Sequence, residues 1–240
     1  MRILPQQLQP TSAVATRLAA LAALTAEDHA RIDEALCRCT ALRPRRDLVV
    51  EGEPITGARL LVEGWAFRSH LVPNGHRQII DFVLPGELIG MCARRDPIGV
   101  ATTTTLTEVT TCPVPIPDPA DGRSGLAQAY AVSAAIGEAH LCRQITRLGR
   151  MSAYERVTDW LLELHDRLLL AGLAGADEFA IPLTQELIAD ALGLTSVHVN
   201  RTIRALRESG LATVGAKRVR LHNRDQMQRL VCYTPVQAVA

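Results

Sequence analysis

Residues 183–221 constrain the fold more than any other stretch of this 240-residue chain. Thr184 is a good helix N-cap, Gly193 is a good helix stop, and the apolar residues between them fall at helical spacing. A second helix is predicted to begin at Thr195 or Ser196, directly after a tight turn. A short helix, a turn and another helix are therefore expected in succession.

The second predicted helix has two distinct faces before it ends near Ser209. Its inner face is apolar, at steps of four and three: Val199, Ile203 and Leu206. Its opposite face carries a small apolar residue and then charged ones: Val197, Arg201, Arg204 and Glu208. The DNA major groove admits one helix, and an arginine can make two hydrogen bonds to guanine. The outer face therefore suits a major groove.

The residues that follow predict a basic β-hairpin. Residues 211–214 and 217–221 read as strands on either side of Gly215-Ala216. From residue 181 to 230 there are eight Arg or Lys and four Asp or Glu residues, whereas the whole chain has a net charge of only +1. Positive charge is thus concentrated where DNA phosphates would lie. The alternative is a helix pair in an all-helical domain with a solvated basic face.

The segment LTQELIADALGLTSVHVNRTIRALRESGL resembles the winged helix-turn-helix of the Crp/Fnr superfamily of bacterial transcription regulators. The resemblance implies base contacts from the second helix, by Ser196, Val197, Asn200 and Arg201. It implies phosphate contacts by Thr184, Gln185, Thr195, His198, Arg204, Lys217 and Arg218, with a plain surface position as the alternative for His198. Members of cyclic-AMP-type specificity carry Arg-Glu where this chain has Ser196-Val197, so a different target sequence is expected.

Between residues 45 and 116 the sequence changes to short β-type runs. Four glycines in this region are spaced by twelve, eleven and eleven residues: Gly52, Gly64, Gly75 and Gly86. Regular turns at such a spacing predict a β-sandwich or rolled barrel. The region, and LVEGWAFRSHLVPNGHRQIIDFVLPGELIG in particular, resembles the eight-stranded β-roll sensor domain of the same superfamily.

Together the two resemblances imply an α+β fold in three parts. These are an N-terminal helix and jelly-roll-like β-roll (a double-stranded β-helix) over 1–120, a dimerisation helix over 121–151 and a winged helix-turn-helix domain over 152–240. The central helix is expected from Ser124 to Gly149. Its apolar positions recur every seven residues, at Ala127, Ala134, Leu141 and Leu148, with Tyr130 and Met151 at companion positions. In the family this helix pairs with its copy; packing on its own sensor domain is the alternative.

The effector site is harder to assign. Gly86-Glu87-Leu88 matches a Gly-Glu-Leu tripeptide of the family's cyclic-nucleotide pocket. When the strands are aligned, however, the pocket tripeptide corresponds to Gly90-Met91-Cys92, with Met91 in place of the glutamate. The family's phosphate-binding arginine corresponds to Gly99 or Val100, neither of which is basic. A buried cyclic phosphate needs a fixed cation or a nest of amides. A cyclic nucleotide is therefore not the expected effector. The candidate pocket residues are Glu87, Met91, Cys92, Arg94 and Arg95, the last two being either substitute cations or part of a solvated loop.

No cofactor or metal is predicted. A helix that begins at Thr25 is expected to reach Pro44 and to carry Cys37 and Cys39, which would then point apart. The six cysteines of this chain do not form a disulfide framework, so free thiols are expected, and a redox-sensing thiol stays open. No P-loop, nucleophile motif or paired zinc ligands occur in the sequence, so an enzyme is not expected.

Composition completes the prediction. A hydrophobic content of 48% supplies real cores, no apolar run reaches the length of a membrane span, and Arg17 interrupts the one segment that approaches a secretory signal. The predicted function is a cytoplasmic, homodimeric regulator that binds near-palindromic promoter DNA, with RNA polymerase as a further partner and no membrane. The alternative is a ligand- or redox-sensing module that acts through protein partners and binds DNA weakly and non-specifically.

Overall fold

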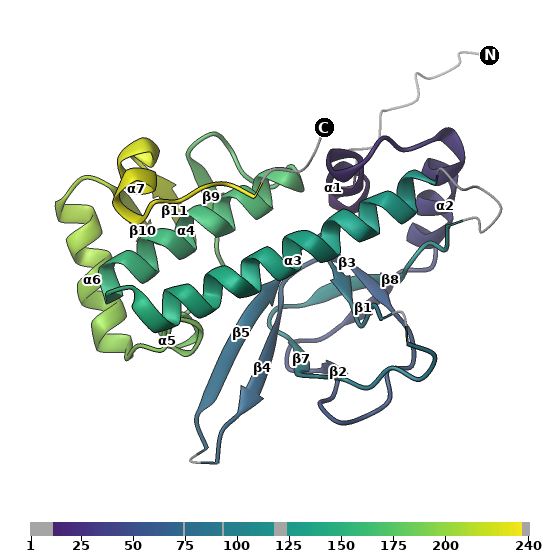
Figure 1. The fold of residues 1–240 in the computed structure, drawn as a ribbon, viewed down its shortest axis with the longest axis horizontal. Helices are drawn as coiled ribbons and strands as arrows, with labels where there is room; N and C mark the ends of the chain where they lie inside the picture. The colour runs from purple at the N-terminus through teal and green to yellow at the C-terminus, as the bar shows by residue number, and fades with distance from the viewer. Residues whose placement is uncertain (1–11, 74, 93, 118–123, 237–240) are drawn as a thin grey trace, which may run out of the picture.

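The computed structural model describes residues 12–73, 75–92, 94–117 and 124–236 (Figure 1). Within these residues, eight strands form two four-stranded antiparallel sheets that make the predicted β-roll. One sheet has the order β1-β8-β3-β6 and the other β2-β7-β4-β5. The strands are β1 (Thr40–Leu42), β2 (Asp47–Val49), β3 (Arg59–Glu63), β4 (Ala66–Leu71), β5 (Arg77–Val83), β6 (Leu88–Ile89), β7 (Thr102–Thr105) and β8 (Val109–Pro113).

The sequence of the roll explains its turns and its inner face. In β7 the side chains of Thr103 and Thr105 are buried and alternate with half-exposed neighbours, as expected for a strand with one face on a core. Gly64 joins β3 to β4 with a φ of +81°, and a Cβ there would lie 2.2 Å from the Glu108 carbonyl oxygen. Only glycine fits that turn.

Four helices surround or extend the roll: α1 (Ala13–Leu21), α2 (Ala26–Leu36), α3 (Gly125–Arg150) and α4 (Ala153–Leu170). Helix α3 crosses the roll and connects it to the C-terminal unit (Figure 1). Its start is capped by Ser124, and α4 begins with a reciprocal capping box between Ser152 and Glu155. The start of α3 agrees with the sequence-based prediction.

The prediction for the end of α2 was wrong. The helix stops at Leu36 with Cys37 as its C-cap, and Cys39 lies in the extended segment just before β1. Residues 40–42 pair with β8 instead of continuing the helix. Long-range strand pairing therefore overrides the local helical pattern.

The C-terminal unit contains α5 (Gln185–Leu192), α6 (Ser196–Glu208) and α7 (Arg224–Val231), with β9 (Glu178–Ala180), β10 (Ala212–Gly215) and β11 (Arg218–Leu221). The hairpin turn falls on Ala216 and Lys217, with φ of +50° and +59°, one residue later than the sequence suggested. Strand β9 pairs with β11 and widens the hairpin to a three-stranded sheet. Neither β9 nor α7 was predicted.

The β-roll and the C-terminal unit share one hydrophobic core. The Phe82 ring of β5 lies 6.1 Å from Trp65 and 5.9 Å from Trp160 of α4, centroid to centroid. Side chains from three elements also hold the C-terminal end of α5. Gln78 of β5 and Gln144 of α3 both donate to the Ala191 carbonyl oxygen, and Arg156 of α4 donates to that of Leu192.

A buried arginine network lies at the junction of α1, α3, α4 and the roll. Its members are Arg17, Arg147, Arg167, Asp81, Glu87, Asp159 and Glu163. The Arg167 guanidinium reaches Glu87 at 2.7 Å, Asp81 at 2.8 Å and Glu163 at 3.1 Å. Burial alone would lower the pKa of Arg167, but the carboxylates of Asp81 and Glu87 raise it well above its usual value. Arg167 therefore stays charged, and its ion pairs fix how these elements meet.

Candidate DNA-binding interface

Helix α6 is built to present one face to an external partner. Thr195 caps it by accepting a hydrogen bond from the His198 backbone N–H at 3.2 Å. Its inner side chains, Val199, Ile203 and Leu206, are buried against α4 and α5, as predicted. Gly193 ends α5 in the left-handed conformation, so the two helices join through a short turn. The predicted helix-turn-helix is thus present.

The outer face of α6 is open to solvent. The four predicted base-contacting residues are all exposed: Ser196, Val197, Asn200 and Arg201. Together with Gln185 and Arg204 they line a shallow depression of about 470 Å³. Val197 is 64% exposed, which is unusual for an apolar side chain and leaves its methyl groups free. The depression therefore combines apolar, amide and cationic groups.

The cations of this face differ in their partners. Arg204 donates to Glu208 one turn later at 2.8 Å, whereas Arg201 has no hydrogen-bond or ion-pair partner within the described residues. Asn200 donates its amide hydrogen to the Gln185 side-chain oxygen at 3.2 Å, so α5 orients a side chain of α6. All the N–H donors of the Arg201 guanidinium are therefore available to an external partner, whereas Arg204 uses part of its donors on Glu208.

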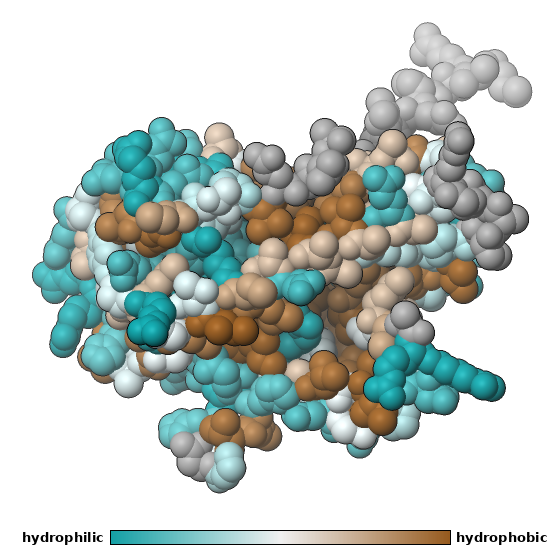
Figure 2. All heavy atoms as spheres, viewed as in Figure 1, coloured by the Kyte–Doolittle hydropathy of each residue, from teal (hydrophilic) through white to brown (hydrophobic). Residues whose placement is uncertain are grey.

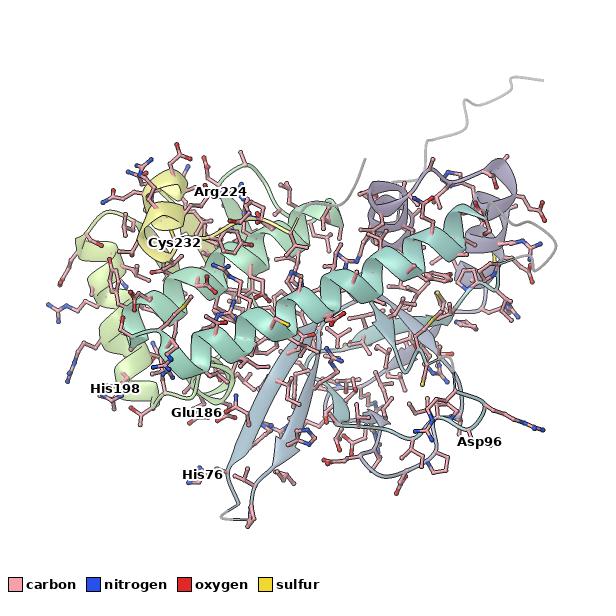
Figure 3. The ribbon with its side chains drawn as sticks, in the orientation of Figure 1. His76, Asp96, Glu186, His198, Arg224 and Cys232 are labelled. Carbon is pink, nitrogen blue, oxygen red and sulfur yellow. The ribbon has the colours of Figure 1, made fainter. Side chains whose placement is uncertain are left out.

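The residues predicted to contact phosphates are all exposed: Thr184, Gln185, Thr195, His198, Arg204, Lys217 and Arg218. His198 and Glu186 lie at the same end of the molecule, beside the α5–α6 turn (Figure 3). In the hairpin, Lys217 occupies the turn, and Arg218 forms an ion pair with Glu178 of β9 at 3.0 Å. Thr184 accepts from the Leu187 N–H at 3.3 Å, so its hydroxyl oxygen also serves as the cap of α5.

The candidate effector residues do not come together. A cavity of about 360 Å³ lies between the roll and α3, and of the candidate residues only Glu87 and Met91 line it. Cys92, Arg94 and Arg95 are exposed and lie outside it. Burial opposes ionisation of Glu87, but the guanidinium of Arg167 outweighs it and holds the pKa of the carboxyl below its usual value. Glu87 is thus a partner of Arg167 in the buried arginine network.

The structure also shows cavity-lining residues that the sequence did not single out. Arg17, Arg68 and His140 line the same cavity from α1, β4 and α3. Burial, and then the nearby Arg167, lower the pKa of His140 below its usual value. No periodicity or motif marks these residues, because they meet only when three distant segments pack together. Across the described ranges, no group of three or more His, Cys, Asp or Glu side chains is arranged to hold a metal ion.

Comparison with known proteins decides the family. Residues 155–230 match the Crp-like helix-turn-helix domain. The chain is 32% identical over 199 residues to the transcriptional activatory protein AadR of Rhodopseudomonas palustris, covering 78% of this chain and 79% of that protein. The chain belongs to the Crp/Fnr family. It is a DNA-binding transcription regulator, and the family and fold are not those of an enzyme.

Other Crp/Fnr proteins agree with this assignment. The nitrogen fixation regulation protein FixK of Bradyrhizobium diazoefficiens is 33% identical over 162 residues, which cover 64% of this chain and 65% of that protein. The solved structure of FixK2 from Bradyrhizobium japonicum superposes with a TM-score of 0.69 at 28% identity, over 82% of this chain and 98% of that one. In the described part of this Crp/Fnr chain, no helix is both long and apolar enough to cross a membrane.

Proposed function

We propose that this regulator reads promoter DNA with the outer face of α6. Ser196, Val197, Asn200 and Arg201 would contact base edges in the major groove. The surrounding set of Thr184, Gln185, Thr195, His198, Arg204, Lys217 and Arg218 would contact phosphates and set the salt dependence. The main support is Arg201, which is exposed and has no hydrogen-bond or ion-pair partner among the described residues. Arg204, the other arginine that lines the depression, already pairs with Glu208.

The chemistry of this face supports a particular kind of half-site. An apolar side chain recognises the thymine methyl group, an Asn amide pairs with adenine, and Arg pairs with guanine. Val197 supplies the first group, and Asn200 and Arg201 supply the other two from the next turn of α6; all three side chains are exposed. We therefore propose a half-site in which a T, an A and a G are read close together. The hydrogen bond from Asn200 to Gln185 would orient the amide for its base.

A competition experiment tests DNA reading. The pure full-length protein is used to select binding sites from a pool of random DNA fragments. Binding to the selected fragments is then measured against excess non-specific DNA at two salt concentrations. Footprints that survive competition and contain two inverted half-sites about one helical turn apart support the proposal. Weak binding of equal strength on all sequences, abolished by salt, would instead favour a module that acts through protein partners.

We also propose that α3 forms the dimer contact, within the domain division 1–120, 121–151 and 152–240. Exposed residues follow one stripe along this helix: Ala127, Ala131, Ala134, Ala135, Glu138, Cys142, Ile145 and Gly149. The stripe is mostly apolar, and pale to brown spheres follow the course of α3 across the visible face (Figure 2). Ile145 is 72% exposed. Small residues would let two helices approach closely around it.

The stripe differs from the predicted heptad positions. Tyr130 points inward and donates its hydroxyl hydrogen to the Pro115 carbonyl oxygen at 2.8 Å, so it belongs to the core of its own chain. Leu141 and Leu148 are half-buried within the chain, whereas Ala127 and Ala134 are exposed. The exposed surface is therefore rotated towards Ala131, Cys142 and Ile145.

Ile145→Asp tests the dimer contact. The variant should sediment as a monomer and lose most of its affinity for a two-half-site fragment. Val100→Asp is the matched control, because Val100 is 80% exposed but lies on a loop of the roll. A dimer that persists in Ile145→Asp, or dissociates equally in both variants, would exclude α3 as the contact.

We propose that cyclic AMP is not the effector. We also propose that the protein works in the cytoplasm and that RNA polymerase is its partner there. Three carboxylates, Asp81, Glu87 and Glu138, line the cavity. Each arginine that lines it is already paired with Asp81 or Glu87: Arg17, Arg68 and Arg167. A cyclic phosphate would meet acids without a free cation. A rise in Tm or in DNA affinity at micromolar cyclic AMP would contradict this proposal. Transcription from a selected promoter by purified polymerase, with and without the protein, tests the partnership.

A further inference from the structure

Two cysteines that are far apart in sequence face each other beside the first strand of the roll. In the antiparallel pair of β1 and β8, Thr40 is opposite Thr111 and Ala41 is opposite Thr110. One step beyond the end of this ladder, Cys39 lies opposite Cys112. Each of these thiols is close enough to influence the pKa of the other.

The pairing geometry suits a disulfide. Directly opposite residues in an antiparallel pair have Cα atoms about 4.5–5.5 Å apart and side chains on the same face. A disulfide spans Cα separations of roughly 4.4–6.8 Å. Continuing the register by one residue beyond the ladder places these two positions within that range.

The two thiols have complementary accessibility. Cys39 is exposed, so a reagent in solution can reach it, whereas Cys112 is fully buried beneath it. Cys112 belongs to the hydrophobic cluster that includes Leu60 of β3 and Leu126 and Tyr130 of α3. The pair thus connects the surface at the end of α2 with the core on which α3 starts.

We propose that Cys39 and Cys112 form a reversible intramolecular disulfide when the protein meets a low-molecular-weight disulfide. The Cys39 thiolate attacks one sulfur of the reagent, forms a mixed disulfide and releases one thiolate. Cys112 loses its proton to water and attacks the Cys39 sulfur of the mixed disulfide. The second reagent thiolate then leaves. Two cysteine thiols are oxidised, and one reagent disulfide is reduced to two thiols.

The surroundings of the pair determine how fast this exchange runs. Burial, and then the Glu63 carboxylate, raise the pKa of Cys39, and burial together with Cys39 raises the pKa of Cys112 to about 11. Cys37 adds to the first effect, and Arg38 partly offsets the second. Since the thiolate is the attacking species, exchange is slow at neutral pH and accelerates in mildly alkaline buffer.

Peptide mapping of the full-length protein tests the proposal. In a variant with Cys37, Cys92, Cys142 and Cys232 changed to Ser, oxidised glutathione at pH 8.5 should remove two hydrogen atoms from the protein mass and leave no glutathione attached. Trypsin cleaves after Arg38, so a Cys39 peptide is separated from residue 37. After digestion without reductant, the peptide that begins at Cys39 should be linked to the peptide of residues 96–123.

A matched control isolates the second step. Adding Cys112→Ser to the same background should leave one glutathione on Cys39, because no buried thiol remains to displace it. The same map on the unsubstituted protein guards against loss of folding in the serine variants. A stable Cys39–glutathione adduct with Cys112 present, a Cys39 link between two chains, or preferred linkage through Cys37 would each overturn the proposal.

Discussion

Helix α6 and the buried arginine network both contain arginines, but the surroundings of these arginines are opposite. Arg204 on α6 is 74% exposed and pairs with a single carboxylate one turn away. Arg167 on α4 is 3% exposed and contacts Glu163 of its own helix, the carboxylates of Asp81 and Glu87, and the Phe82 backbone carbonyl. A guanidinium in water can exchange its partner for a phosphate or a base, whereas a desolvated one cannot leave its acids. The first arrangement suits recognition, and the second fixes the domain junction.

Removing a cation from the buried network should cause the largest effect. Arg167→Met leaves the buried Glu87 and Glu163 and the half-buried Asp81 without their shared cation, which typically costs about 3–5 kcal/mol of unfolding free energy. Urea denaturation followed by circular dichroism measures this loss. Arg204→Met is the control on the exposed side, and its midpoint should match that of the parent protein. Equal midpoints for both variants would show that the junction does not depend on the network.

Removing the cation at the centre of the recognition face should affect DNA binding and leave folding intact. Arg201→Ala should weaken specific binding by roughly 1–3 kcal/mol and relax the preference at one base pair. Titration of the selected site and its single-base variants measures both effects. Arg229→Ala, which removes an exposed charge from α7, serves as the control. A uniform loss on all sequences would make Arg201 a phosphate contact.

Acid should reveal the buried carboxylates. The pKa of Glu87 is below its usual value of 4.5, and those of Asp81 and Glu163 are also lowered, so the folded protein binds fewer protons than the unfolded chain. Their stabilisation is complete above pH 4.5 and is lost as the pH falls towards the folded-state values. Unfolding free energies measured from pH 6 to 3 should decline more steeply in the parent protein than in Glu87→Gln. Parallel curves would contradict this assignment.

A half-exposed ion pair should give the smallest effect. Arg77 of β5 contacts Asp190 of α5 at 2.6 Å, and each side chain is about one third exposed. Asp190→Ala should cost no more than about 1 kcal/mol of unfolding free energy. Urea denaturation beside Arg167→Met tests this ranking. A loss as large as that of Arg167→Met would mean that partial exposure does not separate the two classes of arginine contact.

Local signals predicted the recognition unit well. Thr184, Thr195 and Gly193 act through hydrogen bonds and backbone angles within a few residues, so the sequence specified the boundaries of α5 and α6 closely. The apolar face of α6 was equally clear, because a helix repeats its inner positions every three or four residues. Whether the outer face contacts the predicted bases is a proposal that binding experiments must test.

Non-local contacts explain what the sequence analysis missed. Residues 40–42 were predicted to be helical, but in the structure they form β1 and pair with β8. Strand β9 has three residues and pairs with β11. Tyr130 fitted a dimer seam by its spacing, but the Pro115 carbonyl lies on its inner side. Spacing gives the angle of a side chain around a helix, whereas only packing shows what occupies that side.

The sequence by itself determined the helix-turn-helix and the concentration of positive charge near the C-terminus, because capping, periodicity and charge can be read from residues that are close in the chain. The family followed from the resemblance of two segments to a known superfamily. The tertiary structure alone decided which arginines are free. Arg201 and Arg167 both lie on helices and carry the same charge. Their difference arises because Asp81 of β5, Glu87 just before β6 and Glu163 of α4 surround Arg167 with acids. Nothing in the described fold encloses Arg201.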